Sequence, residues 1–470
     1  MKKLFILLAI LLSASLQAAT PDAKSDSPVK NHLQNHFKFY GFIRNYFIFD
    51  SRESKSGTSD LFYYLPLDER PNEDGSLDLN DHASFRFVAL TSRVGVDVSG
   101  YQIGNVHFGA KFEADFYTGL TSVAADKSPA KIFPGNTNIS GTAQMRLRQA
   151  YTTVTWKDLP LSNDQKAAVA LKLGQAWHPM AADMPHVFDL EVGAPFGPFS
   201  RTPQVTMDAS LGKNWIVSAS AIWQMQYLSA GPLGSSAIYM KYGMTPEIYA
   251  GITFKSKGFL ARAGVDLLSI KPRVYGTRTV DAPAGENPTQ PITVKVSDRK
   301  TSLLYYLYAQ YTYKSFSIKA KTTYGEGGEH LSLMSGYAKV DVMQDGSWEY
   351  ASLRNSSSWL SMSVGKKWQG ILFLGYMKNL GLAQAAPNGA ISKGDVYFFG
   401  NGFSNLNQMY RVNPQLMYNI GKLNLGLEYQ WTSVQYGEYD NDALNAYGLA
   451  DKGLHWVGNH RVGMLVKYNF

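Results

Sequence analysis

The sequence predicts an all-β fold, a transmembrane antiparallel β-barrel of about 16 strands with short periplasmic turns and long external loops. Three observations carry this prediction. A unit of alternating apolar and polar residues recurs from residue 37 to residue 470, the gaps between units alternate between short and long, and each unit has one apolar and one polar face. A period of two is typical of a β-strand with different surroundings on its two sides.

Sixteen segments carry this alternation, and no stretch of the chain keeps a helical period. An even strand number is usual for single-chain outer-membrane barrels. The expected strands are 37–49, 84–98, 103–117, 143–156, 167–178, 202–212, 214–227, 246–255, 258–270, 302–314, 316–325, 356–366, 369–379, 407–420, 422–436 and 456–470.

The gaps between these strands fall into two classes. The tight turns are SGYQ, GKN, KSKG, KSF, KKWQG and IGK, with KDLPLSNDQK as one longer member. The long connections are rich in Gly, Pro, Ser, Asn and Asp, which is typical of surface loops. Short connections at one end and long ones at the other are typical of an outer-membrane barrel. The long connections are 50–83, 118–142, 179–201, 228–245, 271–301, 326–355, 380–406 and 437–455.

The two faces of a strand indicate what surrounds the sheet. Segment 103–117 has Phe108 and Phe112 on one face and Lys111 and Glu113 on the other. Because lipid offers no hydrogen bonds to the backbone, a sheet crosses a membrane only when it closes on itself. A soluble β-sandwich alternates in the same way, but its strands are usually only about 5–6 residues long. Aromatic residues also gather near the strand ends, as at membrane interfaces, so a barrel is favoured.

The N-terminal residues indicate export. MKK is a positive region, LFILLAILL is an apolar core, and SASLQA supplies small residues before a cleavage site after Ala18. This pattern predicts a cleaved signal peptide over residues 1–18. A short periplasmic segment at 19–36 and the barrel at 37–470 follow it. The chain has no cysteine, and we expect it in the bacterial outer membrane, in contact with lipid and lipopolysaccharide.

The C-terminal segment HRVGMLVKYNF alternates to its last residue, with Val466, Tyr468 and Phe470 on one face. It resembles the C-terminal signal of bacterial outer-membrane proteins that the barrel-assembly machinery reads. The resemblance implies that these three residues form an assembly signal and that the machinery is a partner during biogenesis.

Two further motifs carry a family resemblance. They are MRLRQAYTTV at 145–154 and LKLGQAWHP at 171–179. With the strand pattern, they resemble the general outer-membrane porins across almost the whole mature chain, and within them the DcaP-like branch. That branch often has a helical periplasmic extension, for which residues 19–36 are too short. The resemblance implies a homotrimer of separate pores and passive diffusion of small polar, often anionic, solutes, with no cofactor.

The polar faces of the strands predict a cation-rich lumen. The expected pore-lining cations are Arg44, Arg93, Lys111, Arg146, Arg148, Lys172, Arg262, Arg411 and Arg461. Acids on the same faces are fewer, and cations that line a narrow passage raise the local concentration of anions. The alternative is that a water-filled barrel simply tolerates charges of both signs.

Arg146 and Arg148 are expected to set the anion preference more than the other cations do. They lie two residues apart on one strand, so their side chains point the same way. Leu147 and Tyr151 hold the opposite parity and would face lipid or a neighbouring subunit.

The third long loop, at 178–202, is the candidate constriction. It has four prolines and more apolar residues than a solvated loop needs. Folded inward, it would bring Asp183, Asp189 and Glu191 to face Arg146 and Arg148. The alternative is an ordinary external loop packed over the rim.

Rival functions find less support in the sequence. The chain has no Gly-x-Ser-x-Gly, His-Glu-x-x-His or phosphate-loop motif, and its nine histidines are dispersed, so neither an enzyme nor a metal site is expected. A plugged transporter would need about 22 strands. Lys and Arg are scattered singly, so nucleic acid is not an expected partner. A surface-exposed barrel that acts mainly as an adhesin or structural protein stays open as the alternative.

Overall fold

The computed structural model describes residues 36–57, 63–118, 143–162, 165–187, 193–281 and 289–470. The expected signal peptide and nearly all of the expected periplasmic segment lie outside these residues. No helix among the described residues is long and apolar enough to cross a membrane.

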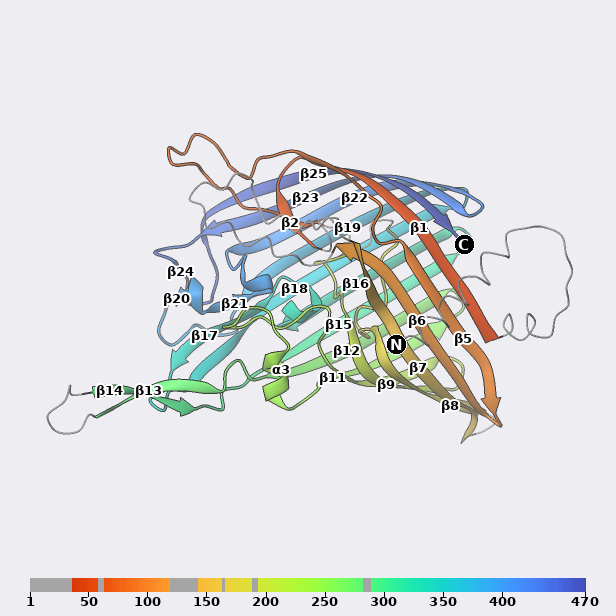
Figure 1. Cartoon of the computed structure of the whole chain (residues 1–470), viewed down its shortest axis with the longest axis horizontal. Helices are drawn as coiled ribbons and strands as arrows, with labels where there is room; N and C mark the ends of the chain where they lie inside the picture. The colour runs from red at the N-terminus through yellow and green to blue at the C-terminus, as the bar shows by residue number, and fades with distance from the viewer. Residues whose placement is uncertain (1–35, 58–62, 119–142, 163–164, 188–192, 282–288) are drawn as a thin grey trace, which may run out of the picture.

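The described strands form a closed antiparallel barrel of sixteen strands, as the sequence predicted (Figure 1). Each barrel strand pairs with its neighbour along the chain, and the last strand pairs with the first. The second barrel strand consists of two pieces, β4 and β5, which both pair with β1. The barrel strands are β1 (Phe37–Asp50), β4 (Ser84–Val88) with β5 (Arg93–Ile103), β6 (Val106–Thr118), β7 (Ala143–Ser162), β8 (Gln165–Trp177), β9 (Arg201–Leu211), β10 (Trp215–Ile222), β11 (Glu247–Ser256), β12 (Phe259–Ile270), β15 (Lys300–Tyr313), β16 (Phe316–Glu326), β18 (Trp348–Gly365), β19 (Trp368–Gly381), β22 (Leu406–Ile420), β23 (Leu423–Glu438) and β25 (Lys452–Asn469).

Shorter elements lie in the long connections. They are β2 (Ser54–Ser56), β3 (Tyr63–Pro66), α3 (Ile238–Gly243), β13 (Tyr275–Asp281), β14 (Thr289–Lys295), η3 (Glu329–Leu331), β17 (Gly336–Val342), β20 (Ile391–Ser392), η4 (Lys393–Asp395), β21 (Val396–Phe398), η5 (Phe399–Asn401) and β24 (Ala443–Leu444). The β13–β14 hairpin projects well beyond the end of the barrel (Figure 1).

Several of the expected strand boundaries are wrong, among them the start of β18, which lies eight residues before the expected one. SGYQ is not a turn, because β5 continues through it to Ile103 and the chain reverses at Gly104, which has a positive φ. KDLPLSNDQK is not a loop, because β7 and β8 extend into it through two bulges. β10 ends at Ile222, five residues before the expected end.

The outer and inner faces differ as the alternation predicted. On β6, Phe108, Phe112 and Phe116 are each about 40 % exposed, whereas Glu113 and Asp115 are buried. Apolar side chains exposed all round a closed barrel fit a lipid surface. Charged side chains at the alternate positions therefore face the interior.

The barrel closes through the β1–β25 ladder. Gly41 and Phe470 exchange backbone hydrogen bonds of 3.4 and 3.1 Å. A Cβ atom on Gly41 would lie 2.4 Å from the Phe470 ring, so only glycine leaves room for that ring. Phe470 and Tyr468 are each about half exposed.

Several described parts of the long connections pack over and into one end of the barrel, which we call the loop end. The opposite end carries the tight turns and is called the turn end. Most of the buried apolar residues belong to one cluster that joins loop residues such as Leu65, Phe196 and Leu333 to wall residues such as Tyr306 and Phe373. The main core of this protein therefore lies inside the barrel and is built largely by loops.

Candidate channel constriction

The connection between β8 and β9, residues 178–200, crosses the interior and is called L3. Its described parts are 178–187 and 193–200. Lys321 on β16 donates from Nζ to the Met180 carbonyl at 2.7 Å, and Lys319 donates to the Met184 carbonyl at 3.1 Å. Arg411 on β22 donates to the Ala194 carbonyl at 3.1 Å. Because β16 and β22 lie across the barrel from β8, L3 spans the lumen.

Apolar side chains fix L3 against the far wall. Phe196 is fully buried and lies edge-on to Phe373, with their ring centroids 6.1 Å apart. It covers Gly375, where a Cβ atom would lie 2.5 Å from the Phe196 ring. Burial of such a side chain contributes about 1.5–3 kcal/mol, so the inward position is supported by packing as well as by hydrogen bonds.

The acidic residues of L3 do not lie as the sequence predicted. Asp183 pairs with Arg262 on β12, with 3.2 Å between Nη1 and Oδ2. The expectation that Asp183 faces Arg146 and Arg148 is therefore wrong. Asp189 and Glu191 lie outside the described residues.

Arg146 and Arg148 pair with carboxylates on the neighbouring strand β6. Arg146 Nε lies 3.0 Å from Asp115 Oδ1. Arg148 lies 2.9 Å from Glu113 and 2.6 Å from Asp115, and its side chain is only 2 % exposed. We call these four residues the β6–β7 ladder. Its two positive charges face two negative charges on the same wall, and Glu113 also lies 3.5 Å from Arg93.

The expected outward direction of Tyr151 is wrong because of a β-bulge. The β6–β7 register shifts between Glu113 and Ala114, so the residue after Arg148 keeps the inward parity. Tyr151 is then opposite Lys111, and the Lys172 ammonium lies 5.4 Å from its ring. Tyr151 therefore faces the lumen, whereas Leu147, which is 40 % exposed, faces outward as expected.

The remaining predicted cations have varied partners. Lys111 pairs with Asp97 at 2.7 Å and Arg461 with Asp50 at 3.0 Å. Arg411 donates to backbone carbonyls and to Thr432. All of these side chains lie on the inner face, although their part in conduction stays a prediction.

Three cations surround the ring of Phe42 on the inner face of β1. Arg44, Arg93 and Lys467 lie 4.8, 5.0 and 4.6 Å from its centroid. Arg93 has a carboxylate neighbour, Glu113 at 3.5 Å. Arg44 donates to Thr91, which has a positive φ in the break between β4 and β5. The interrupted second strand thus orients one of the predicted cations.

A cavity of about 320 Å³ lies between L3 and the barrel wall. Arg44, Lys321 and Lys467 contribute positive charge to its lining, and Asp183 is the one carboxylate among the described residues that line it. Several other lining residues belong to the turn-end halves of β19, β22, β23 and β25, so the cavity lies on the turn side of L3. Its size is that of a site for a small solute.

His186 of L3 also lines this cavity and was not singled out from the sequence. Its Nε2 lies 3.2 Å from Ser317 Oγ, and its backbone amide donates to Ser361 at 2.9 Å. Burial and the nearby Lys319 lower the pKa of His186 to about 4, so it is neutral near pH 7. No local sequence signal distinguishes it from an ordinary loop histidine.

One comparison with solved structures supports the fold. The chain is similar to the outer-membrane channel DcaP of Acinetobacter baumannii, with 16 % identity and a TM-score of 0.58 over 92 % of this chain and 97 % of that one. It also matches an anion-selective porin from Comamonas acidovorans, with 8 % identity and a TM-score of 0.47 over 92 % of this chain and 99 % of that one. No family model and no curated protein matches the sequence.

The protein thus has the fold of an outer-membrane porin. Its resemblance to the DcaP-like branch, predicted from the two motifs, is confirmed at the level of fold.

Proposed function

We propose that this chain is a porin of the bacterial outer membrane, a water-filled diffusion channel for small hydrophilic solutes with a preference for anions. The fold supports the channel. The observation that carries the anion preference is that two lysines of the wall near L3, Lys319 and Lys467, have no carboxylate within 4.0 Å among the described residues.

Lys319 and Lys467 are half-buried on the inner wall. Among the residues that the structure describes, neither has a carboxylate within 4.0 Å. Lys319 bonds to the neutral Met184 carbonyl, and Lys467 lies against the Phe42 ring. Because neither partner carries a net negative charge, both ammonium groups keep their long-range field, which attracts anions into a narrow passage.

The β6–β7 ladder contributes less to this field. Its charges cancel within a few ångströms, so Arg146 and Arg148 are not the main source of anion preference in this proposal. Guanidinium groups still grip carboxylates and phosphates in pairs, so a passing anion is expected to contact Arg44 and Arg93 near Lys467.

The proposal includes a homotrimer and a cleaved signal peptide at 1–18. It also includes an assembly signal at Val466, Tyr468 and Phe470 that the barrel-assembly machinery reads. The position of Phe470 beside β1, where the barrel closes, supports this last part.

One feature favours the alternative of a surface adhesin. The β13–β14 hairpin projects beyond the barrel and exposes Tyr275 and Ile292 (Figure 1). An adhesin needs such a projection but no open passage.

Planar-bilayer recording of the purified protein separates the two functions. A porin gives discrete conductance steps, and an anion preference places the reversal potential in a potassium chloride gradient on the chloride side of zero. Absence of steps from folded protein would favour the adhesin, and a reversal potential on the potassium side would contradict the anion preference.

A further inference from the structure

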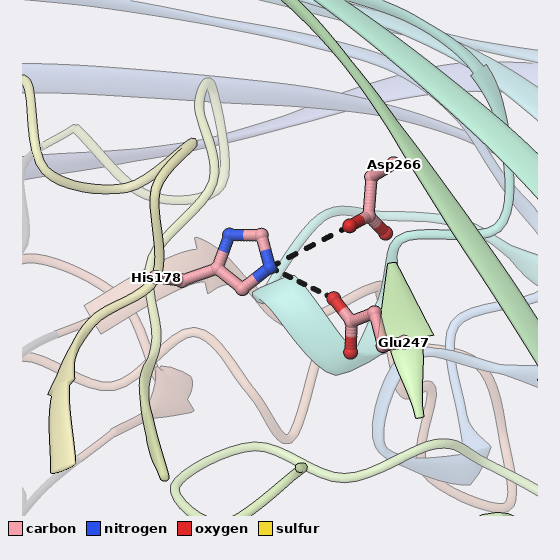
Figure 2. A group of neighbouring side chains, drawn as sticks. All are labelled: His178, Glu247 and Asp266. Atoms are coloured by element: carbon pink, nitrogen blue, oxygen red, sulfur yellow. Dashed lines mark hydrogen bonds and ion pairs between the residues drawn. The ribbon is translucent and has the colours of Figure 1, made fainter. Parts of the chain in front are cut away.

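Four ionisable side chains from four elements meet inside the barrel near the loop end. They are His178 at the start of L3, Glu247 at the start of β11, Asp266 on β12 and His330 on η3. All four are at most 3 % exposed. Figure 2 shows the His178 ring directed at both carboxylates.

One carboxylate oxygen joins two loops to the wall. Glu247 Oε1 lies 2.8 Å from His178 Nε2 and 3.1 Å from His330 Nε2. Asp266 lies 3.7 Å from His178 and 4.0 Å from His330. L3 and the loop that carries η3 are therefore held to β11 through a single acceptor, and we call these four residues the histidine node.

The composition of the histidine node fits zinc, since the ligand atoms of His178, Glu247 and Asp266 lie within 4.8 Å of one another. The Met180 amide, however, donates to His178 Nδ1 at 3.2 Å. A neutral imidazole whose Nδ1 accepts carries its proton on Nε2. His178 Nε2 therefore donates to Glu247 and has no lone pair for a metal. The histidine node is thus better suited to hydrogen bonds than to a bound metal ion.

The charges around His330 favour its protonated form. Burial lowers the pKa of His330, but the Glu247 carboxylate raises it more, so the net pKa is raised. Glu329 on η3 also raises the pKa, and Lys300 on β15 lowers it. The fourth group that faces His330 is Asp266. A buried carboxylate without a compensating charge is costly, so the imidazolium is the natural partner of Glu247.

We propose that Glu247, His178 and His330 are positioning residues for L3, and that the proton on His330 determines how firmly L3 is held across the lumen. The consequence for conduction, a constriction that loosens when His330 loses its proton, rests on the proposed function.

The direction of the pH dependence follows from the raised pKa of His330. The stabilisation is fully present below the usual histidine pKa of about 6.5 and is lost as the pH rises through the raised value. Alkaline pH should therefore loosen L3, whereas acid should not.

Hydrogen exchange of the full-length protein in lipid nanodiscs tests this without requiring conduction. The measured quantity is the exchange of segment 179–187 relative to segment 357–363 on β18, followed from pH 6 to pH 10. In wild type we expect the ratio to rise by up to about tenfold as the pH passes the raised pKa of His330, because a charged hydrogen bond to Glu247 becomes a neutral one. H330Q should exchange fast across the whole range. A pH-independent wild type, or an H330Q variant identical to wild type, would overturn the proposal.

Two further variants complete the design. H455Q is the matched control, because His455 also pairs with a carboxylate, Asp68 at 2.7 Å, outside L3, and it should keep the wild-type response. H178Q retains a neutral donor towards Glu247 and should also keep that response. If added Zn²⁺ protects segment 179–187 in wild type but not in E247Q, the node is a metal site and the proton account is wrong. Because exchange does not depend on conduction, a failed channel recording leaves this test intact.

Discussion

The positive side chains of two parts of the lumen wall have different partners. On β6 and β7, Arg146 and Arg148 lie within 3.0 Å of Asp115 or Glu113. On β16 and β25, Lys319 and Lys467 contact a carbonyl and an aromatic ring. The cations of the first wall are paired with carboxylates, whereas those of the second have no carboxylate within 4.0 Å among the described residues. We therefore expect selectivity to depend on how the cations are paired as well as on their number.

The difference also separates structure from permeation. A buried, hydrogen-bonded ion pair costs much to break, although it adds little field outside itself. A half-buried ammonium beside neutral groups adds little to stability but acts on passing ions. We expect the arginines to matter mainly for the wall and the lysines mainly for the solute.

Neither wall can form unless the barrel closes, so a change that prevents closure should have the largest effect. Deleting Phe470 removes both the ring over Gly41 and the backbone pair with it. We expect most of the folded, heat-modifiable protein to disappear from the outer membrane while synthesis continues. F470Y keeps an aromatic ring and should assemble normally; normal assembly of the truncated chain would disprove the role of Phe470.

Removing one charge of the β6–β7 ladder should cause the next largest effect, a loss of stability. R148Q leaves Glu113 and Asp115 buried with one cation fewer, and we expect a loss of about 3–5 kcal/mol in the free energy of unfolding. The measurement is urea unfolding in lipid vesicles.

Two controls sharpen that result. R148Q with E113Q removes both charges and should restore part of the stability. K166Q breaks an exposed pair with Asp158 and should leave the stability nearly unchanged, because solvent screens such a pair. Equal effects of R148Q and K166Q would mean that the ladder is not buried as described.

Shortening L3 should enlarge the passage, although it also removes the Met184 carbonyl that Lys319 contacts. Deletion of residues 181–193 removes Asp183 and His186 and keeps the Met180 and Phe196 anchors. We expect a larger single-channel conductance, because L3 crosses the lumen. Unchanged conductance from folded protein would mean that ions pass elsewhere.

Most of the barrel could be predicted from the sequence, because lipid outside and water inside impose a period of two on every strand. The bulge at Arg148 could not, since one extra residue leaves the composition of β7 unchanged while it turns Tyr151 inward. The β6–β7 ladder was within reach, because two acids two residues apart precede two arginines with the same spacing on the next strand.

The contacts of L3 were beyond sequence analysis. They join residues far apart in the chain, such as Ala194 with Arg411 and Met180 with Lys321, and no periodicity encodes them. The histidine node was missed for the same reason, because its members come from four separate elements.

The reversal potential in a potassium chloride gradient tests the central claim most directly, measured for wild type and two double variants. K319Q with K467Q removes the two lysines that have no carboxylate within 4.0 Å among the described residues, and it should move the reversal potential towards the potassium side. R148Q with E113Q also removes two charged groups but leaves the net charge unchanged, and it should keep the wild-type value. A shift in the ladder variant with none in the lysine variant would contradict the account.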